Sequence, residues 1–373
     1  MNSVYVAADN IFSPIGATTA ENFERIKTGA TGVQLQNNKA IADEPFYASL
    51  FTDNAQFEGA KYTKFEQLLI ASIKDALSRC EVRPDDEKTI LIISTTKGNI
   101  SMLETEPDRA DLQERIALPA SAKLVAEYFG FVNTPVIISN ACISGIMAVL
   151  TGLRSIRSGK YENAVIAGAD EITKFILSGF QAFQAVSSEP CKPFDENRTG
   201  ITLGEAGATM ILSSNPKYSG DIKVLSGAVS NDANHISAPS RTGEELAIAI
   251  KKTMNDAEVN ADGVDILSAH GTATSYNDDM EAKALALAGL QDVPVNSLKG
   301  FYGHTLGAAG LVESIISIQS LRENVFLPTP GFETLGVPAM INVNKELLSG
   351  NFSTCLKTAS GFGGCNAAVL FSK

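Results

Sequence analysis

A strand, a polar turn and a helix rich in small residues occur twice in this chain, at residues 136–157 and again at residues 293–321. The first copy carries Cys142 in its turn, and the second carries His304. Directly after the first turn, apolar residues recur at helical spacing. The repetition suggests an internal duplication, and it predicts an α/β fold with two strand-to-helix junctions of the same kind.

Cys142 stands where the first apolar strand ends and the helix begins. Unpaired backbone N–H groups and the positive end of the helix dipole favour thiolate over thiol at such a position. The same N–H groups can hold a developing oxyanion. The alternative is that Cys142 is an inert core residue, as most cysteines with apolar neighbours are. The residues around the histidines decide between these interpretations.

Histidine is scarce in this sequence, with only three among 373 residues. Two of them, His270 and His304, lie in turns of small residues that follow plausible strands. Reactive groups usually lie on loops that a rigid scaffold positions. Lys299 precedes His304 by five residues and Glu313 follows it by nine, so a charge pair is available to orient the imidazole. These residues favour a catalytic role for Cys142.

The order of the motifs resembles the decarboxylating β-ketoacyl synthases, which are members of the thiolase superfamily. A single match would be weak evidence, whereas several ordered matches that include the cysteine and both histidines are specific. The matching segments cover essentially the whole chain and comprise residues 12–32, the turn at Cys142, and residues 192–207, 270–281, 299–310 and 361–366.

The resemblance implies a thiolase-like α/β fold, with two duplicated βαβαβαββ halves in a five-layered αβαβα sandwich. The halves would be residues 1–215, which carry the nucleophilic cysteine, and residues 216–373, which carry both catalytic histidines. We expect one compact body, because no linker rich in proline or serine and no low-complexity block divides the chain. Residues 354–372, which alternate around a glycine-rich turn, predict a closing β-hairpin.

The activity implied by the resemblance is a decarboxylative Claisen condensation in fatty acid, polyketide or polyene biosynthesis. Cys142 would accept an acyl group from a carrier protein as a thioester. His270 and His304 would donate N–H to the malonyl thioester carbonyl and stabilise the enolate that forms as carbon dioxide leaves. The backbone N–H groups of Cys142 and Phe362 would hold the tetrahedral oxyanion, and the Phe362 ring would gate the acyl pocket. No metal or cofactor is needed, because phosphopantetheine enters on the acyl carrier protein.

The resemblance also implies supporting residues. Lys299 would order the active-site hydrogen bonds with Glu313, while Asp278 and Glu281 would hold the His270 loop together. The ordinary alternatives are solvated charges for the lysines and core packing for the aromatic residues. Acyl-pocket candidates are Ile143, Phe180 and Cys365, and candidate carrier-docking cations are Lys61, Lys64 and Arg115.

Other interpretations stay open at this point. A chain-length-factor-like subunit would keep the fold and pair with an active synthase, but such subunits typically lose the nucleophile. A non-condensing acyltransferase or hydrolase would use Cys142 without needing two enolate donors. Thiolase chemistry would need a second catalytic cysteine near the C-terminus, for which Cys365 is the candidate.

Composition bounds the setting and the partners. The formal charge of −12 argues against nucleic acid binding, which needs clustered Lys and Arg. Five dispersed cysteines without C-x-x-C spacing support neither a disulfide framework nor a zinc site. The sequence has no signal-peptide pattern and no long apolar stretch, so we expect no membrane span and a cytoplasmic location. We also expect a homodimer, or a heterodimer with a homologous subunit.

Overall fold

Ten strands form one mixed sheet in the computed structural model, which describes residues 3–52, 61–219, 222–233 and 239–373. The N-terminal part of the chain contributes β1 (Tyr5–Phe12), β4 (Thr89–Ser94), β5 (Val136–Ile138), β6 (Asn163–Asp170) and β8 (Ala206–Ser213). The C-terminal part contributes β9 (Lys223–Asn231), β10 (Ile266–Ser268), β11 (Val295–Asn296), β14 (Thr354–Gly361) and β15 (Cys365–Ser372).

The two groups of strands share one topology. When the strands of each group are numbered in chain order, both groups lie in the order 3-2-4-5-1 across the sheet. In both groups the pairs 3-2 and 2-4 are parallel, and the pairs 4-5 and 5-1 are antiparallel. The first strands of the groups, β1 and β9, join at the pairing of Tyr5 with Lys223. The same strand order and pairing in both groups are the mark of an internal duplication.

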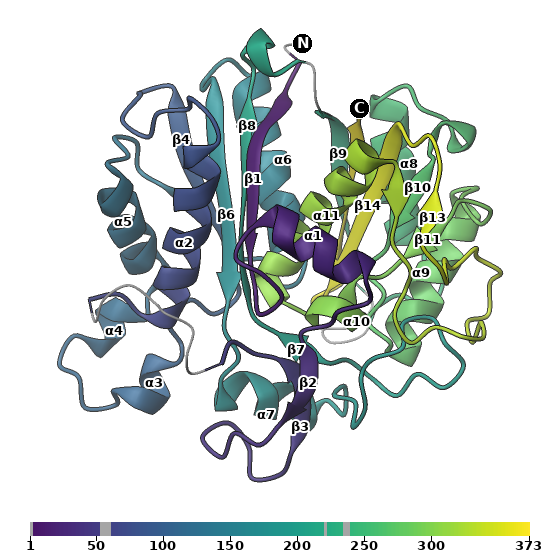
Figure 1. The fold of residues 1–373 in the computed structure, drawn as a ribbon, viewed down its shortest axis with the longest axis horizontal. Helices are drawn as coiled ribbons and strands as arrows, with labels where there is room; N and C mark the ends of the chain where they lie inside the picture. The colour runs from purple at the N-terminus through teal and green to yellow at the C-terminus, as the bar shows by residue number, and fades with distance from the viewer. Residues whose placement is uncertain (1–2, 53–60, 220–221, 234–238) are drawn as a thin grey trace.

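Helices complete the layers on both sides of each strand group (Figure 1). At the centre, α6 (Ser144–Arg157) and α11 (Ala309–Glu323) contact each other and strands of both groups. The expected five-layered αβαβα sandwich is confirmed, although its two sheet layers are continuous through β1 and β9. The outer helices are α2 (Lys64–Ser78) and α5 (Leu118–Phe129) beside the N-terminal strands, and α8 (Glu244–Asp256) and α9 (Ser275–Leu287) beside the C-terminal strands.

The two central helices cross at very short range because glycines stand at the crossing. A Cβ atom on Gly145 of α6 would lie only 2.6 Å from the backbone nitrogen of Leu311 in α11. Gly310, on the facing helix, is similarly confined. Each helix directly follows a turn that carries a predicted site residue. The crossing therefore brings Cys142 and His304 together from opposite halves of the molecule.

The predicted site residues follow the carboxyl ends of parallel strands, where ligands bind in many α/β proteins. Cys142 comes four residues after β5 ends, and His270 comes two residues after β10 ends. The predicted closing hairpin is confirmed, since β14 and β15 pair in antiparallel register from Thr354 opposite Ser372 to Gly361 opposite Cys365. The expected boundary at residues 215 and 216 falls in the connection between β8 and β9.

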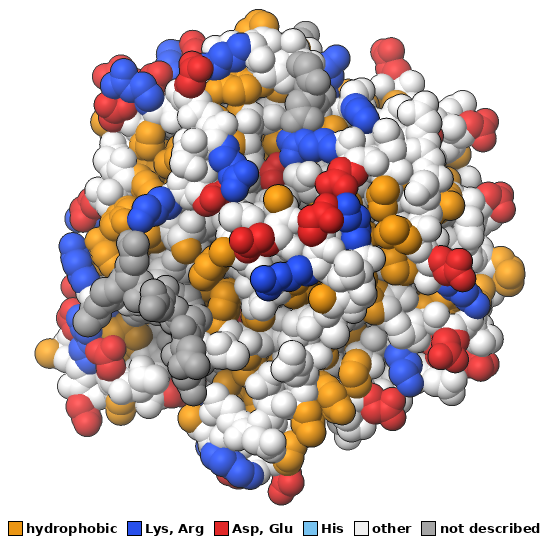
Figure 2. All heavy atoms as spheres, in the orientation of Figure 1, with side chains coloured by type: hydrophobic (Ala, Val, Ile, Leu, Met, Phe, Trp, Pro, Cys, Tyr) orange, Lys and Arg blue, Asp and Glu red, His pale blue; other side chains and the backbone are white. Residues whose placement is uncertain are grey.

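Shorter elements complete the fold. Acidic and basic side chains are interspersed over the face that Figure 2 shows. Within the described part of the chain, no helix combines the length and apolar character that crossing a membrane requires. The shorter elements are α1 (Thr19–Lys27), α3 (Met102–Thr105), α4 (Leu112–Arg115), α7 (Lys174–Ala182), α10 (Lys299–Tyr302), β2 (Val33–Gln36), β3 (Phe46–Ser49), β7 (Leu203–Gly204), β12 (Val325–Phe326) and β13 (Leu348–Ser349).

Candidate active site

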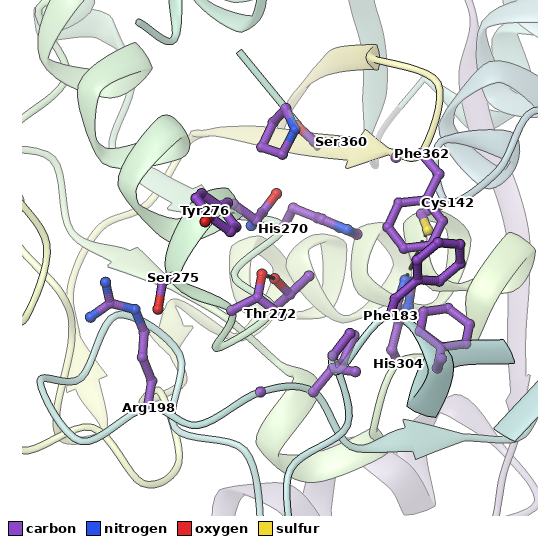
Figure 3. Close-up of a pocket in the computed structure, with 18 of the residues that line it drawn as sticks. Cys142, Phe183, Arg198, His270, Thr272, Ser275, Tyr276, His304, Ser360 and Phe362 are labelled. Carbon is purple, nitrogen blue, oxygen red and sulfur yellow. Dashed lines mark hydrogen bonds between the residues drawn. The ribbon is translucent and has the colours of Figure 1, made fainter. Parts of the chain in front are cut away.

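A cavity of about 650 Å³ opens beside Cys142 (Figure 3). One part of its lining is aromatic and consists of the rings of Phe180, Phe183 and Phe362. The opposite part is polar, and an elongated ligand with one apolar and one polar end would fit such a lining. The polar part includes Arg198, Thr272, Thr274, Ser275, Tyr276 and Asn277.

Cys142 lies in a strained turn between β5 and α6. The preceding residue, Ala141, has a φ of +44°, in a region that residues other than glycine rarely adopt. Ser144 holds the turn closed, because its Oγ accepts a hydrogen bond from the backbone N–H of Asn140 at 2.8 Å and donates one to the carbonyl of Ala141 at 2.7 Å. The turn presents the thiol to the cavity.

The thiol of Cys142 is buried, and this burial raises its pKa to about 12. The finding corrects our sequence-based expectation that the helix N-terminus would favour the thiolate. The physical reason is desolvation, because burial disfavours the charged thiolate more than the ammonium of Lys299 favours it. The resting group is therefore the neutral thiol, and its deprotonation must be coupled to the chemistry.

His304 is the immediate neighbour of the thiol. Its Nε2 lies 3.0 Å from Sγ of Cys142, and its Nδ1 accepts a hydrogen bond from the backbone N–H of Leu306 at 3.2 Å. Because Nδ1 is an acceptor, the neutral ring carries its proton on Nε2, toward the thiol. Burial, together with the charges of Lys299 and Lys357, lowers the pKa of His304 well below its ordinary value. The ring is therefore held as a neutral N–H donor.

A buried lysine orients His270 in the same way. Nζ of Lys299 lies 3.3 Å from Nδ1 of His270, donates to the His270 carbonyl, and forms an ion pair with Glu313 at 2.6 Å. An ammonium group can only donate, so Nδ1 of His270 accepts and the proton lies on Nε2. Burial and the charge of Lys299 lower the pKa of His270 well below its ordinary value. The rings of His270 and His304 meet edge to face, with centroids 5.2 Å apart.

The sulfur of Cys142 and one nitrogen of each histidine lie within 4.8 Å of one another, close enough to suggest a metal centre. Thiolate and imidazole are ligands that Zn²⁺ prefers. A metal-bound histidine, however, normally donates its second N–H to an acceptor. Here the second nitrogens face donors instead, namely the N–H of Leu306 and the ammonium of Lys299. The arrangement suits two N–H donors aimed at a common acceptor better than a metal ion.

Two buried carboxylates of α9 hold the turn that carries His270. Glu281 accepts hydrogen bonds from the backbone N–H groups of His270 and Gly271, both at 2.7 Å. Asp278 accepts one from the N–H of Thr272 at 2.9 Å, and burial raises the pKa of Asp278 to about 6. Both side chains thus contact the segment that the sequence analysis assigned to them.

The end of the closing hairpin lies directly against the nucleophile. A Cβ atom on Gly361 would lie only 2.9 Å from the amide nitrogen of Cys142, so this close approach needs glycine. Phe362 follows at once and projects its ring over the cavity (Figure 3). Its ring stacks on Phe180 with centroids 5.7 Å apart and meets Phe183 edge-on at 5.3 Å. Any molecule that enters the aromatic part must displace or pass these rings.

Two of the three predicted acyl-pocket residues lie away from the cavity. Ile143 is fully buried in the hydrophobic core at the start of α6. Cys365 points its sulfur at the carbonyl oxygen of Phe362, 3.3 Å away, and burial raises its pKa to about 11. The third residue, Phe180, does line the cavity. Cys365 nevertheless lies near enough to Cys142 to act on the pKa of its thiol.

Two of the three predicted carrier-docking cations are engaged in internal ion pairs. Lys64 donates to both oxygens of the buried Glu205 at 2.7 Å. Arg115 makes two hydrogen bonds to the buried Glu66, at 2.8 and 3.0 Å. A buried carboxylate needs such a partner, so these two cations serve the fold. Lys61 is exposed and stays a candidate for docking.

The sequence analysis missed three residues that shape the site. Phe183 follows Phe180 by about one helical turn, a spacing that could have been noticed. Asp170 accepts a hydrogen bond from the backbone N–H of Gly307 at 2.7 Å and so supports the turn after His304. Lys357 is fully buried on β14. Its signal was a single charge inside an otherwise uncharged hairpin strand.

Two family models match the chain. The beta-ketoacyl synthase N-terminal domain matches residues 2–217, and the beta-ketoacyl synthase C-terminal domain matches residues 223–333. The 3-oxoacyl-[acyl-carrier-protein] synthase 2 of Vibrio cholerae is 28% identical over 99% of this chain and 99% of its own. Putative polyketide beta-ketoacyl synthase 1 of Streptomyces halstedii is 27% identical over 84% of this chain and 82% of its own.

Solved structures share the fold at low sequence identity. A beta-ketoacyl synthase from Burkholderia phymatum superimposes with a TM-score of 0.89 at 22% identity, over 100% of both chains. The ishigamide ketosynthase/chain length factor gives 0.89 at 22% identity, over 100% of this chain and 99% of that one. A ketosynthase in complex with its chain length factor from Xenorhabdus doucetiae gives 0.87 at 22% identity, over 100% and 98%.

Proposed function

Because this chain belongs to the β-ketoacyl synthase family of acyltransferases in fatty acid and polyketide synthesis, we propose that Cys142, His270 and His304 carry out its decarboxylative condensation. The observation that carries this assignment is the orientation of the two imidazoles. In both rings Nδ1 faces a hydrogen-bond donor and acts as an acceptor, so the ring proton lies on Nε2. Both Nε2–H groups therefore point into the space beside the Cys142 sulfur. Two neutral donors that converge there would stabilise a developing enolate oxygen.

In the first step, the sulfur of Cys142 attacks the carbonyl of an acyl-carrier thioester. The backbone N–H groups of Cys142 and Phe362 would hold the oxyanion of the tetrahedral intermediate, because the hairpin end lies against the Cys142 amide. The bond to the carrier sulfur then breaks. That sulfur takes up the proton that the Cys142 thiol gives up, so the charge balances. Acylation also releases His304 Nε2–H from its contact with a free thiol.

In the second step, the thioester carbonyl of malonyl-carrier protein accepts hydrogen bonds from the N–H groups of His270 and His304. The bond between the methylene carbon and the carboxylate breaks, carbon dioxide leaves, and the electron pair forms the enolate. The enolate carbon attacks the carbonyl of acyl-Cys142, and the bond from carbon to the Cys142 sulfur breaks. A proton from solvent restores the thiol, and a β-ketoacyl thioester departs on the carrier.

The carrier's phosphopantetheine arm would enter through the polar part of the cavity, and the acyl chain would lie in the aromatic part. This reaction needs no metal or organic cofactor of the protein's own, because the two histidines supply the charge stabilisation. Lys61 is our candidate contact for the acidic carrier protein. The reaction does need a reduced thiol, and the five unpaired cysteines are in keeping with the reducing cytoplasm.

We further propose that the protein pairs through β5, either with itself or with a homologous subunit. β5 lies at one edge of the sheet, so among the described residues one side of its backbone has no partner strand. Val132 and Val136, before and on this strand, are 57% and 37% exposed. An edge strand beside exposed apolar side chains favours pairing with another chain. Since Cys142 and both histidines are present, the chain would be the condensing partner and not a chain-length factor.

Release of carbon dioxide from malonyl-carrier protein tests the histidine roles separately from acyl transfer. In Cys142→Ala both imidazoles persist, so decarboxylation should continue although no condensation follows. In His270→Ala or His304→Ala, carbon dioxide release should fall by about 10²–10³. Undiminished release in the histidine variants would overturn the proposal.

A further inference from the structure

A second fully buried lysine lies beneath the two histidines. Lys357 of β14 has no exposed surface, and its Nζ lies 2.7 Å from Oε2 of Glu313. The same Nζ donates to the carbonyl oxygens of Ala269 at 2.9 Å and Ser268 at 3.3 Å, at the end of β10. Nζ of Lys357 thus makes two hydrogen bonds to carbonyl oxygens and one ion pair with a carboxylate. The geometry is therefore that of a charged lysine in the protein interior.

Lys299 approaches Glu313 from the other side. It is also fully buried, and it forms its ion pair with Oε1 of Glu313 while contacting the carbonyl and Nδ1 of His270. Glu313 is thus shared by two ammonium groups, one at each oxygen. Two positive charges and one negative charge leave a net positive charge in a region without water contact.

The other ionisable groups near the histidines are hydrogen-bonded to the backbone, and the charge of Glu281 also acts on Lys357, whose pKa it raises. Glu281 accepts hydrogen bonds from the backbone N–H groups of His270 and Gly271. Asp278 accepts one from the backbone N–H of Thr272. Asp170 accepts hydrogen bonds from the backbone N–H groups of Thr96 and Gly307, beneath the His304 turn. Cys142 rests as a neutral thiol, because burial raises its pKa. Lys299 and Lys357 are the cations that act on both rings, and Glu313 is the carboxylate that pairs with both of them.

We propose that Lys357 is a positioning residue that keeps His270 and His304 as neutral N–H donors by making the buried cluster of Lys299, Glu313 and Lys357 net positive. A protonated His270 would place an N–H on Nδ1 against the ammonium of Lys299, and the extra charge of Lys357 disfavours that state further. This inference rests on the proposed function, in which the two rings donate N–H groups to the enolate. The charge state itself can be measured without any substrate.

The electrostatic direction agrees with this geometry. Lys357 is among the causes that lower the pKa of His270 and of His304. Its own pKa is lowered, chiefly by burial, and Glu313 opposes that effect. Without Lys357, the charge of Glu313 would cancel that of Lys299. Protonation of either histidine would then meet less repulsion.

The test is a pH titration by NMR of protein labelled with ¹³C at the histidine Cε1 position. The chain has only three histidines, so His270 and His304 can be assigned from single His→Gln variants. In the wild type, we expect the titration midpoints of both rings to lie well below the ordinary pKa of histidine. In Lys357→Met, both midpoints should rise by about one pH unit or more.

A charge-restoring double variant separates electrostatics from packing. Lys357→Met combined with Glu313→Gln leaves Lys299 as the sole charge of the cluster, so the net charge is positive again. The midpoints should return toward the wild-type values. Lys357→Gln serves in place of Lys357→Met if the latter does not fold. The inference is overturned if the midpoints do not rise in Lys357→Met or Lys357→Gln. It is also overturned if they do not fall again in the double variant.

Carbon dioxide release from malonyl-carrier protein distinguishes this inference from the proposed function. If both hold, the acidic limb of the pH–rate profile moves to higher pH in Lys357→Met by the same interval as the NMR midpoints. If the midpoints move but no variant releases carbon dioxide, the charge role stands and the proposed function fails. If the enzyme is active but the midpoints do not move, Lys357 has a structural role alone.

Discussion

Nε2 of His304 lies 3.0 Å from Sγ of Cys142, although the two residues are 162 positions apart in the chain. They meet because α6 and α11 cross where glycines allow the backbones to approach. The backbone N–H of Leu306 fixes the tautomer of His304, so a donor and not a base faces the thiol. His304 is therefore suited to stabilise the anion that appears after Cys142 has been acylated.

The first prediction separates the two chemical steps. His304→Ala should lower the rate of condensation by about 10²–10³, because one of two enolate donors is lost. Acylation of Cys142 should be affected much less, since that oxyanion is expected to rest on backbone N–H groups. Single-turnover measurements of acyl loading and of β-ketoacyl product formation give the two rates. An equal loss in both steps would contradict this division of roles.

The second prediction concerns the pH dependence of the thiol. Burial raises the pKa of Cys142 to about 12, so the thiol stays protonated at neutral pH and loses its proton only as pH rises toward that value. The rate of alkylation of Cys142 by iodoacetamide should therefore increase about tenfold per pH unit between pH 7 and pH 10. Peptide mass spectrometry measures the rate, with Cys142→Ala as the control. A plateau below pH 8 would show that the helix N-terminus and His304 outweigh burial.

The third prediction concerns the helix crossing. Gly145→Ala places a Cβ atom 2.6 Å from the backbone nitrogen of Leu311, so the central helices must move apart. We expect a loss of at least about 1–3 kcal/mol in unfolding free energy, measured by chemical denaturation. Gly179→Ala is the matched control, because a Cβ atom there meets nothing within 4 Å inside α7. It should be neutral or stabilise by up to about 1 kcal/mol. Equal effects of both changes would argue against a tight crossing.

The fourth prediction distinguishes fold cations from docking cations. Arg115→Ala leaves the carboxylate of Glu66 buried without its partner and should cost about 3–5 kcal/mol of stability. Lys61→Ala should change stability by less than about 0.5 kcal/mol but weaken binding of the acyl carrier protein, most clearly at low salt. Denaturation and carrier-binding titrations measure the two effects. A stable Arg115→Ala protein that no longer binds the carrier would restore Arg115 as a docking residue.

Much of the fold could be predicted from sequence because its parts are local. The strand and turn at Cys142 and the later copy at His304 lie in short segments with clear periodicity. The pairing of β1 with β9, which makes the two sheet layers continuous, could not be inferred in this way. It joins strands that lie far apart in the chain, and local patterns carry no information on such a pairing.

The proposed catalytic role of Cys142, His270 and His304 could be inferred from residue type and setting. The burial of these residues and the charges around them could not. Lys357 looks like an ordinary strand residue until α11 brings Glu313 against it. Lys64 looks like a surface lysine until Glu205, 141 residues away, becomes its buried partner. The raised pKa of Cys142 likewise depends on how completely the folded chain encloses the sulfur.

Intact mass spectrometry of the protein tests the central claim most directly. The protein is loaded with an acyl-carrier thioester and then given malonyl-carrier protein, with Cys142→Ala and His304→Ala measured in parallel. The account predicts an acyl adduct on Cys142 that is discharged as a β-ketoacyl-carrier product, with no adduct in Cys142→Ala and an adduct that persists in His304→Ala. No adduct with any acyl chain would contradict it and favour a partner subunit, and an adduct released as free acid would favour a hydrolase.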